Sequence, residues 1–262
     1  MIRRALTVAV ALAATMTMAV GCGADHSSAP HAGPASSVPS SSPTATPAPT
    51  ASPTTSPKPA TSAKPAMLRA GSKGAAVTAL QERLTELGYW NGKTDGTFGG
   101  TTQQAVFALQ KAAALSRDGV VGPKTSAALA KGVRPKAHSS TGHVIEINKA
   151  KQLLMIVDNG TVSMILNTST GSGRHYTYEG ETYLASTPSG RFTASRQING
   201  WRNGPLGPLW RPKYFNGGIA VHGAPSVPPY PASHGCARVS IAAMNWIWAN
   251  GKMPLKTKVW VY

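Results

Sequence analysis

Hydrophobic and polar positions follow a helical period in the stretch after residue 70. Four large aliphatic residues there recur at intervals of three and four: Val77, Leu80, Leu84 and Leu87. This spacing places them on one face of an α-helix. Ser72 precedes the run and Gly88 follows it, so we predict a helix over 72–87 that Ser72 caps and Gly88 ends.

A five-residue motif occurs twice after this helix. Asp95-Gly96-Thr97-Phe98-Gly99 returns as Asp118-Gly119-Val120-Val121-Gly122, and an alanine-rich run with helical spacing follows each copy. Asp-Gly favours a tight turn, and the Thr102 and Thr125 that come next are typical of helix starts. The patterns predict a small all-α module of three helices over 67–132.

From residue 142 the period changes to the alternation and short apolar runs of β-strands. Strands are expected over 143–148, 152–157, 161–167, 191–195, 218–222 and 258–262. Asp158-Asn159-Gly160 is typical of a hairpin turn, and a single helix is expected from Ser240, as cap, to Asn250. After a basic polar connector over 133–141, residues 142–262 therefore predict a mostly β domain, sandwich-like or barrel-like.

The first 66 residues lack the pattern of a folded domain. Arg3 and Arg4 precede an apolar run over 6–20 that is short for a membrane span and ends in small residues, as an export signal does. Residues 25–66 are mostly Ser, Thr, Ala and Pro, which bury too little apolar surface to fold. We predict a signal peptide over 1–21 and an extended tether over 22–66.

The chain has 2 cysteines, Cys22 and Cys236. Ala19-Val20-Gly21-Cys22 resembles a bacterial lipobox, whose cysteine is lipidated and becomes the first residue of the mature protein. Ordinary signal cleavage near Cys22 and an uncleaved anchor are the alternatives. Lipidation would leave Cys236 as a free thiol in an exported protein, which indicates a reactive group. We expect an exported lipoprotein that is anchored to the membrane and faces the cell wall.

The formal net charge of +17 indicates a polyanionic partner. Nucleic acid fits poorly, because the positive residues are scattered singly, no basic helix face or RNA-binding motif is present, and the export signal leads away from it. An anionic wall polymer or a membrane surface fits better, and wall peptides also carry carboxylates.

Ser233-His234-Gly235-Cys236-Ala237-Arg238 surrounds the thiol with groups suited to nucleophilic catalysis. A histidine can take the thiol proton and return it to a leaving amine. His222 and His234 are both candidates, and their spacing alone does not decide between them. Backbone N–H groups around Gly235 and Cys236 could form an oxyanion hole. Arg238 could bind a substrate carboxylate or stabilise the thiolate.

Two other interpretations of Cys236 compete with catalysis. A buried structural cysteine is common, but the flanking His, Gly and Arg residues are poor core material. A zinc site made by His222, His234 and Cys236 has suitable ligand types but lacks a tightly spaced ligand pair. We expect neither a metal nor another cofactor.

Residues 67–132 resemble the type-1 peptidoglycan-binding family. The resemblance rests on the stretches 68–74, 80–81 and 87–89 and on the two Asp-Gly turns. It implies a non-catalytic module that binds the cell wall, for which Tyr89, Trp90 and Asn91 are candidate contacts. The alternatives are core packing for these residues and a spacer that binds nothing.

Residues 142–262 resemble the L,D-transpeptidases, the YkuD-like catalytic domain. The resemblance rests on His222-Gly223, on 233–238, and on the supporting stretches 152–160, 169–171 and 187–192. It implies that Cys236 is the acyl-accepting nucleophile, that His222 is the general base and acid, and that His234 has a supporting role. It further places Gly235 in the oxyanion hole and Ser233 and Arg238 at the substrate.

The implied reaction is acyl transfer on peptidoglycan stem tetrapeptides. Cys236 attacks the carbonyl of the diamino acid at stem position 3, D-Ala leaves, and the amine of a second stem takes the acyl group, which gives a 3→3 cross-link. The resemblance also implies acylation by carbapenems. The alternatives are an L,D-carboxypeptidase-type hydrolase, in which water replaces the amine, and a non-catalytic peptidoglycan-binding lipoprotein. Acceptor choice depends on loop shape and water access, so the sequence does not separate transfer from hydrolysis.

A Gly- and Pro-rich insert over 197–217 contains Trp201, Arg202, Trp210 and Arg211. One interpretation is a lid or acceptor-binding loop over the thiol. The other is a surface loop that tryptophan packing anchors. A second loop contains Tyr176, Tyr178 and Tyr183, for which the sequence suggests no role.

Overall fold

The structure is a computed structural model that describes residues 67–262. The predicted signal peptide, Cys22 and the tether lie outside these residues and stay predictions. Every helix and strand that the structure describes belongs to one compact unit. Within residues 67–262, no helix is long and apolar enough to cross a membrane.

Three helices occupy the N-terminal part of the described chain: α1 (Ala75–Glu86), α2 (Gly100–Ala112) and α3 (Pro123–Ala130). The predicted cap at Ser72 is wrong. α1 begins after Gly74, and the Ser72 hydroxyl instead accepts a hydrogen bond from the backbone N–H of Arg69 at 3.1 Å. Gly88 does end the helix: its φ is +75°, and its N–H donates to the Thr85 carbonyl at 2.8 Å.

The duplicated motif has a structural purpose, because a buried glutamine binds each copy. Gln81 Nε2 donates to Asp95 Oδ1 at 3.0 Å and to Thr102 Oγ1 at 3.0 Å, so one side chain joins α1 to the turn and to the first turn of α2. Gln110 makes the same contacts with the second copy. The threonines therefore accept hydrogen bonds inside the helices rather than capping them.

Two open sheets form the C-terminal part. The strands of the first are, in spatial order, β3 (Thr161–Asn167), β2 (Leu153–Asp158), β1 (His143–Asn148), β12 (Lys258–Val261) and β6 (Gly190–Thr193). The strands of the second are β11 (Ala237–Ser240), β10 (Ile219–Ala224), β9 (Gly207–Asn216) and β7 (Arg196–Gln197), with β8 (Trp201–Gly204) also paired to β9. β4 (His175–Tyr178) and β5 (Glu181–Leu184) form a separate hairpin. The predicted mostly β character is confirmed, with open sheets rather than a closed barrel.

One face of the first sheet and the second sheet enclose a common core with α4 (Ile241–Ala249). Ile145 and Ile156 from the first sheet, Val221 and Val239 from the second, and Met244 from α4 belong to this cluster. The predicted cap of α4 is confirmed, because the Ser240 hydroxyl accepts from the N–H of Ala243 at 3.2 Å. α4 begins directly after β11 and thereby fixes the end of the strand that follows Cys236.

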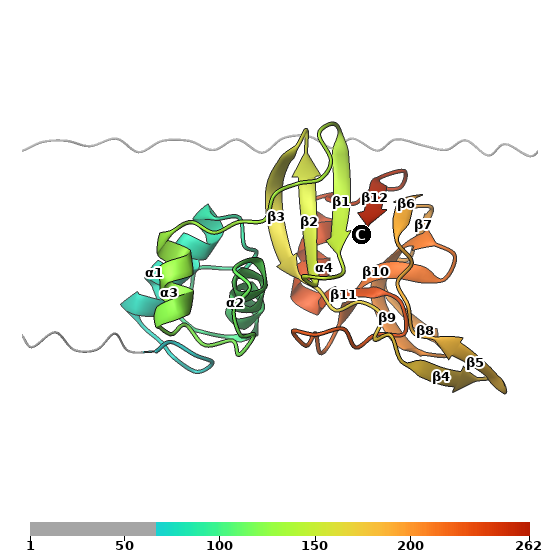
Figure 1. The fold of residues 1–262 in the computed structure, drawn as a ribbon, viewed down its shortest axis with the longest axis horizontal. Helices are drawn as coiled ribbons and strands as arrows, with labels where there is room; N and C mark the ends of the chain where they lie inside the picture. Colours follow the sequence, from blue (N-terminus) through green and yellow to red (C-terminus); the bar gives the residue numbers. More distant parts are fainter. Residues whose placement is uncertain (1–66) are drawn as a thin grey trace, which may run out of the picture. The chain divides into compact units, whose positions relative to one another are not determined.

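The opposite face of the first sheet packs against the helices. Leu153, Met155 and Ile165 of β2 and β3 belong to one buried cluster with Leu84 of α1 and Leu109 of α2. In Figure 1, α2 is the helix that faces β3. The helices and the sheet therefore share a core, and the self-contained three-helix module predicted from the sequence is not confirmed. The predicted boundary between 132 and 142 stays a prediction.

Candidate active site

Parallel pairing of β10 with β11 brings His222 beside the thiol. The register aligns His222 with Arg238 and Val221 with Ala237. Paired residues of neighbouring strands point to the same face of a sheet, so His222 and Arg238 lie on one face, and Cys236 lies in the bend directly before β11. All three line one pocket of about 790 Å³, together with Ser233 and His234. The structure thus brings together the candidate residues that lie fourteen positions apart in the sequence.

Two hairpins form the walls of this pocket. Tyr176 and Tyr183 of the β4–β5 hairpin line one part of it, and residues 204–209 at the tip of the β8–β9 hairpin line another. The tyrosines are cross-strand partners with stacked rings, 5.7 Å between centroids. Sequence reasoning missed both residues. The turn Glu179-Gly180 between two Tyr-containing runs was the signal that a hairpin presents them together.

His222 is buried in the pocket and has one ring nitrogen free to accept a proton. Its side chain is 4% exposed, and its Nδ1 lies 2.9 Å from the carbonyl oxygen of Gly223. A carbonyl only accepts, so Nδ1 carries the hydrogen and Nε2 keeps its lone pair. Burial lowers the pKa of His222 to about 4, so the imidazole is neutral at pH 7 and able to take a proton.

Cys236 is a free thiol whose environment holds it protonated. Burial raises the pKa of Cys236, while a hydrogen bond from the backbone of Ala220 and the positive charge of Arg238 act in the opposite direction. The sulfur lies 3.8 Å from the carbonyl oxygen of Gly218. The resting pair is therefore a thiol and a neutral imidazole rather than a thiolate and an imidazolium.

Ser233 shapes the turn that presents the thiol. Its hydroxyl accepts from the N–H of Gly235 at 3.0 Å and donates to the carbonyl of Cys236 at 2.6 Å. The carbonyl of Gly235 accepts from Thr187 Oγ1 at 2.6 Å. Ser233 is buried, and its hydroxyl braces the backbone of this turn.

These bonds change the expected oxyanion hole. The N–H of Gly235 is already engaged by Ser233, whereas the N–H of Cys236 has no hydrogen-bond partner among the described residues. The turn nevertheless requires a glycine at position 235, because its φ is +150° and a Cβ there would lie 2.9 Å from the Ser186 carbonyl oxygen. Of the two expected donors, Cys236 is the better placed in this conformation.

His234 lies at the exposed edge of the site. The chain bends at 234–236, so the extended backbone that would align His234 with Cys236 is absent. The imidazole packs edge-on against Tyr176, 4.7 Å between ring centroids. Arg238 is held deeper, with Nη1 3.4 Å from the Ala232 carbonyl oxygen and its guanidinium close enough to Cys236 to influence its pKa.

The tryptophan-containing insert over 197–217 is anchored by tryptophan packing and also reaches the pocket. Trp210 is anchored, since its Nε1 donates to Asn245 Oδ1 on α4 at 2.7 Å. Trp201 packs on Trp210 with 5.0 Å between ring centroids and is 49% exposed. The anchored hairpin carries its tip to the pocket, so packing positions the loop and the loop forms a pocket wall.

Two of the three candidates for wall binding belong to the core. Tyr89 is 1% exposed and donates its hydroxyl to the Val133 carbonyl at 2.8 Å. Asn91 is 2% exposed and donates to Thr85 Oγ1 at 2.8 Å. Trp90 packs near Trp246, 6.2 Å between ring centroids. Tyr89 and Asn91 are therefore core residues, as their alternative had it, whereas Trp90 is only partly buried and stays a candidate contact.

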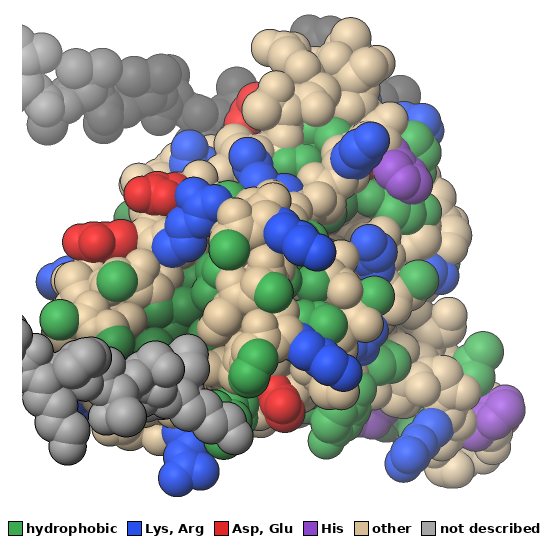
Figure 2. Space-filling model, turned by 60° about the vertical axis from the view of Figure 1, so that its left-hand side comes forward, with side chains coloured by type: hydrophobic (Ala, Val, Ile, Leu, Met, Phe, Trp, Pro, Cys, Tyr) green, Lys and Arg blue, Asp and Glu red, His purple; other side chains and the backbone are tan. Residues whose placement is uncertain are grey.

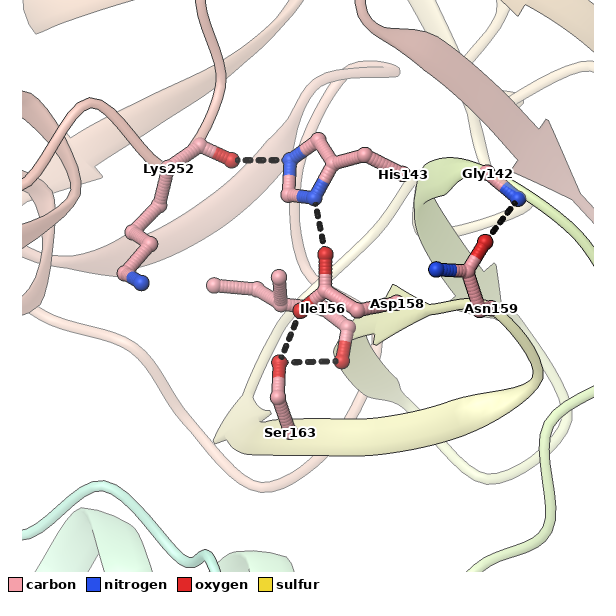
Figure 3. Close-up of polar contacts among 7 residues, drawn as sticks. All are labelled: Gly142, His143, Ile156, Asp158, Asn159, Ser163 and Lys252. Carbon is pink, nitrogen blue, oxygen red and sulfur yellow. Dashed lines mark hydrogen bonds and ion pairs between the residues drawn. The ribbon is translucent and has the colours of Figure 1, made fainter.

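No second catalytic cluster competes with this pocket in the part of the chain that the structure describes. Asp158 Oδ1 lies 2.6 Å from His143 Nδ1, and Ser163 Oγ donates to the other carboxylate oxygen of Asp158 at 2.8 Å (Figure 3). The carboxylate lies between the other two groups, whereas a hydrolytic triad needs the imidazole between them. His143 also contacts the Lys252 carbonyl oxygen, so this cluster joins β1 and β2 to the segment after α4. Residues 67–262 contain no group of three His, Cys, Asp or Glu side chains that could hold a metal ion, so the predicted zinc alternative has no ligand set there.

The surface reflects the basic composition. Figure 2 shows Lys and Arg side chains spread over one face of the molecule, with few acidic side chains among them. The pocket itself is lined by Arg196, Arg202 and Arg238 and by no Asp or Glu within the described residues. A carboxylate-bearing ligand therefore meets a favourable potential on entering it.

Comparison with known proteins assigns both parts of the chain to families. Residues 142–261 match the family model of the L,D-transpeptidase catalytic domain, and residues 73–129 match that of a putative peptidoglycan binding domain. A solved L,D-transpeptidase from Xylanimonas cellulosilytica is 54% identical, with a TM-score of 0.74, over 76% of this chain and 98% of that chain.

Curated relatives match over shorter stretches. The N-acetylmuramoyl-L-alanine amidase CwlL of Bacillus licheniformis is 44% identical over 79 residues, 29% of this chain and 22% of that protein. A spore cortex-lytic enzyme of Bacillus cereus is 27% identical over 164 residues, 57% of this chain and 62% of that protein. The chain spans only 20% to 22% of the length of the first three curated relatives that it matches.

Proposed function

Since the chain belongs to the L,D-transpeptidase family of cell-wall enzymes, we propose that it transfers acyl groups between peptidoglycan stem peptides through a thioester on Cys236. The observation that carries this proposal is that His222 of β10 and Cys236, directly before the adjacent parallel strand β11, line one pocket. The donor is a stem tetrapeptide, and the leaving group is D-Ala.

Acylation begins with the thiol proton. As Sγ of Cys236 attacks the carbonyl at stem position 3, the proton passes to Nε2 of His222, and the carbonyl oxygen becomes an oxyanion that the N–H of Cys236 can bind. The C–N bond to D-Ala then breaks, and His222 returns the proton to the leaving amine. The products are free D-Ala and a thioester on Cys236.

Deacylation reverses the same proton path. The side-chain amine of a second stem attacks the thioester, His222 takes a proton from that amine, and the sulfur leaves and recovers the proton from His222. A new amide bond forms as the C–S bond breaks, which gives the 3→3 cross-link. The low pKa of His222, about 4, makes it a weak resting base and a strong acid once protonated, which favours proton return to the leaving group.

Hydrolysis is the alternative outcome at the same thioester. Water in place of the second amine would give a trimmed stem peptide and an L,D-carboxypeptidase. The volume of about 790 Å³ and the two hairpin walls support transfer, since they leave room for an acceptor peptide beside the donor. Ser233 acts by bracing the turn, His234 lies with Tyr176 at the edge, and Arg238 supplies positive charge.

Mass spectrometry of the full chain with a stem tetrapeptide tests this function. We expect an adduct on Cys236 that lacks D-Ala, followed by a cross-linked dimer. Cys236→Ala should give neither. Lys124→Met, at an exposed position on α3, is the matched control and should behave as the wild type. A trimmed monomer without dimer would replace transfer by hydrolysis, and the absence of any adduct in the wild type would refute the cysteine mechanism. A carbapenem in place of the peptide tests the proposed acylation by that class.

We further propose that the helical region binds peptidoglycan and that Cys22 carries the lipid anchor. The first proposal rests on the family match over 73–129, and the second rests on the sequence around Cys22. Co-sedimentation with purified sacculi, with and without added teichoic acid, tests wall binding and the preference for anionic polymers. Membrane fractionation of cells that express Cys22→Ala tests the anchor, and unchanged membrane association would refute it.

A further inference from the structure

The segment 225–235, here called the active-site loop, connects β10 to Cys236 and has no helix or strand of its own. Two side chains from the helical region hold its backbone from outside. Gln104 of α2 donates from Nε2 to the Val227 carbonyl at 3.1 Å, and Arg117 donates from Nη1 to the Pro229 carbonyl at 2.9 Å. The loop between the proposed base and the proposed nucleophile is thus attached to the region that the family match assigns to wall binding.

Lys111 of α2 is buried beneath the strands and binds segments that in turn contact the active-site loop. It is 2% exposed, and its Nζ donates to the carbonyls of Gln152 at 2.8 Å and Thr168 at 2.9 Å and to the Asn167 side-chain oxygen. The three acceptors match the three N–H donors of the ammonium form. Burial and the positive charge of Arg117 lower the pKa of Lys111 to about 6, so the neutral amine that predominates at pH 7 keeps two of these donors.

From Lys111, one chain of hydrogen bonds leads to Arg238, two residues after Cys236. Thr168, whose carbonyl binds Lys111, donates its hydroxyl to the Arg238 carbonyl at 2.8 Å. The neighbouring Ser169 exchanges both backbone hydrogen bonds with Arg238, at 3.0 and 3.2 Å. Lys111 therefore holds the strand segment to which the start of β11 is tied.

A second chain of bonds leads to the turn itself. The side chain of Gln152 accepts from the N–H of Thr170 at 2.8 Å, and the Thr170 carbonyl accepts from the N–H of Ser233 at 3.0 Å. Ser233 in turn binds the carbonyl of Cys236. Two independent paths thus connect one lysine on a helix to both sides of the thiol.

An apolar residue would be a more stable occupant of the Lys111 position if packing were its only purpose, since burying an amine costs more than burying a methylene chain. We propose that Lys111 is a positioning residue for acyl transfer, and that with Gln104 and Arg117 it fixes the active-site loop so that the helical region forms part of the catalytic unit. This inference rests on the proposed function of Cys236. It extends the role of the helices from wall binding to the geometry of the thiol.

Removal of these three side chains should lower the rate of the chemical step without lowering the affinity for the substrate. None of the three side chains lines the pocket, so their removal leaves the groups that contact a stem peptide in place. A displacement of reacting groups by about 1 Å costs on the order of a hundredfold in rate. We expect Lys111→Met to lower the rate of Cys236 acylation about ten- to a hundredfold, with KM changed less than about twofold, and Arg117→Gln to cause a smaller loss in the same direction.

Single-turnover acylation of the full chain, followed by mass spectrometry, measures this effect. Lys124→Met removes a lysine of the same region that is exposed, and it should leave the rate unchanged. All rates are taken well below the midpoint of thermal unfolding. If Lys111→Met is folded and acylated at the wild-type rate, or if its KM rises while kcat is kept, the inference is refuted. If Lys111→Met fails to fold, Arg117→Gln and Gln104→Leu decide, because their bonds lie at the periphery of the loop.

Hydrogen exchange of residues 225–236 supplies a readout that does not need turnover. We expect faster amide exchange in this segment in Lys111→Met and Arg117→Gln, with exchange in β1 and β2 unchanged. Unchanged exchange in the loop would overturn the inference even in an active enzyme. If the wild type forms no adduct on Cys236, the proposed function fails, and loop exchange still decides whether the helices position this segment.

Discussion

The resting protonation state of Cys236 and His222 predicts different pH profiles for two reactions of the same sulfur. Alkylation by iodoacetamide requires a preformed thiolate. A cysteine of ordinary pKa, about 8.5, is a few per cent thiolate at pH 7, and burial raises the pKa of Cys236 further. We therefore expect slow alkylation at pH 7 that rises about tenfold per pH unit and continues to rise past pH 8.5.

Acylation by a stem peptide follows the state of His222 instead. Its pKa of about 4 leaves the base form almost fully populated from pH 7 down to about pH 5, and the rate should fall only below that, as the imidazole becomes protonated. General-base catalysis contributes about 10²–10⁴-fold, so His222→Gln should lower acylation at pH 7 by roughly that factor. Alkylation at pH 9 should change far less, because it needs no base.

Both rates are measured on one protein sample by intact mass. Iodoacetamide and tetrapeptide are compared at half-unit pH steps, with Cys236→Ala as the blank and Lys124→Met as the matched control. An alkylation rate that is already on a plateau between pH 5 and 7 would refute the reasoning, because it would show a thiolate–imidazolium pair at rest. An acylation rate that declines as the pH falls below 7, with an inflection near pH 6.5, would show that burial does not lower the pKa of His222.

Three further predictions concern stability and local geometry. Gly235→Ala places a Cβ 2.9 Å from the Ser186 carbonyl oxygen at a φ of +150°. We expect the variant to lose about 1–3 kcal/mol of unfolding free energy and to lose acylation. A fully active and equally stable variant would contradict this prediction. Ser240→Ala removes the hydroxyl that caps α4 and should cost about 1 kcal/mol in urea unfolding with acylation unchanged. The pKa of His222 is about 4 in the folded protein, below its unfolded value. The neutral imidazole therefore stabilises the fold above about pH 6.5, and this stabilisation is lost as the pH falls toward 4. The midpoint of thermal unfolding should drop between pH 7 and 4.5 more in the wild type than in His222→Gln.

Much of the fold follows from local patterns in the sequence. The β2–β3 hairpin is specified by Asn159-Gly160, both of which have positive φ, +47° and +80°, in the two-residue turn. α4 is specified by its apolar spacing and by Ser240. Ser72 failed as a cap because a serine before a helical run can equally close a preceding turn through its own side chain. The local sequence does not distinguish these two uses.

The candidate site was predictable where chemistry is concentrated and unpredictable where it depends on register. Cys236 and the two histidines stand out by residue type, and their neighbours in the sequence indicate the reaction. The spacing did not choose between the two histidines, and the prediction of His222 came from the family resemblance. The parallel pairing of β10 with β11, a contact between segments that no local pattern specifies, gives that choice a geometric basis. The engagement of Gly235 by Ser233 is a property of a three-dimensional turn. Tyr176 and Tyr183 reach the pocket only because a hairpin carries them there.

The same distinction applies to the helices, and it bears on how the enzyme is organised. Helical periodicity shows which face of α2 is buried but not what buries it, and a face that includes Lys111 is a poor fit to an isolated three-helix core. The structure explains the buried lysine, because α2 packs on β2 and β3 and Lys111 binds the backbone carbonyls of Gln152 and Thr168. A wall-binding module that was only tethered to the catalytic domain would tolerate an apolar residue there without loss of rate. Conversely, a rate that depends on Lys111 would mean that the helices cannot be exchanged for another binding module without rebuilding the contacts to Val227, Pro229 and Thr168.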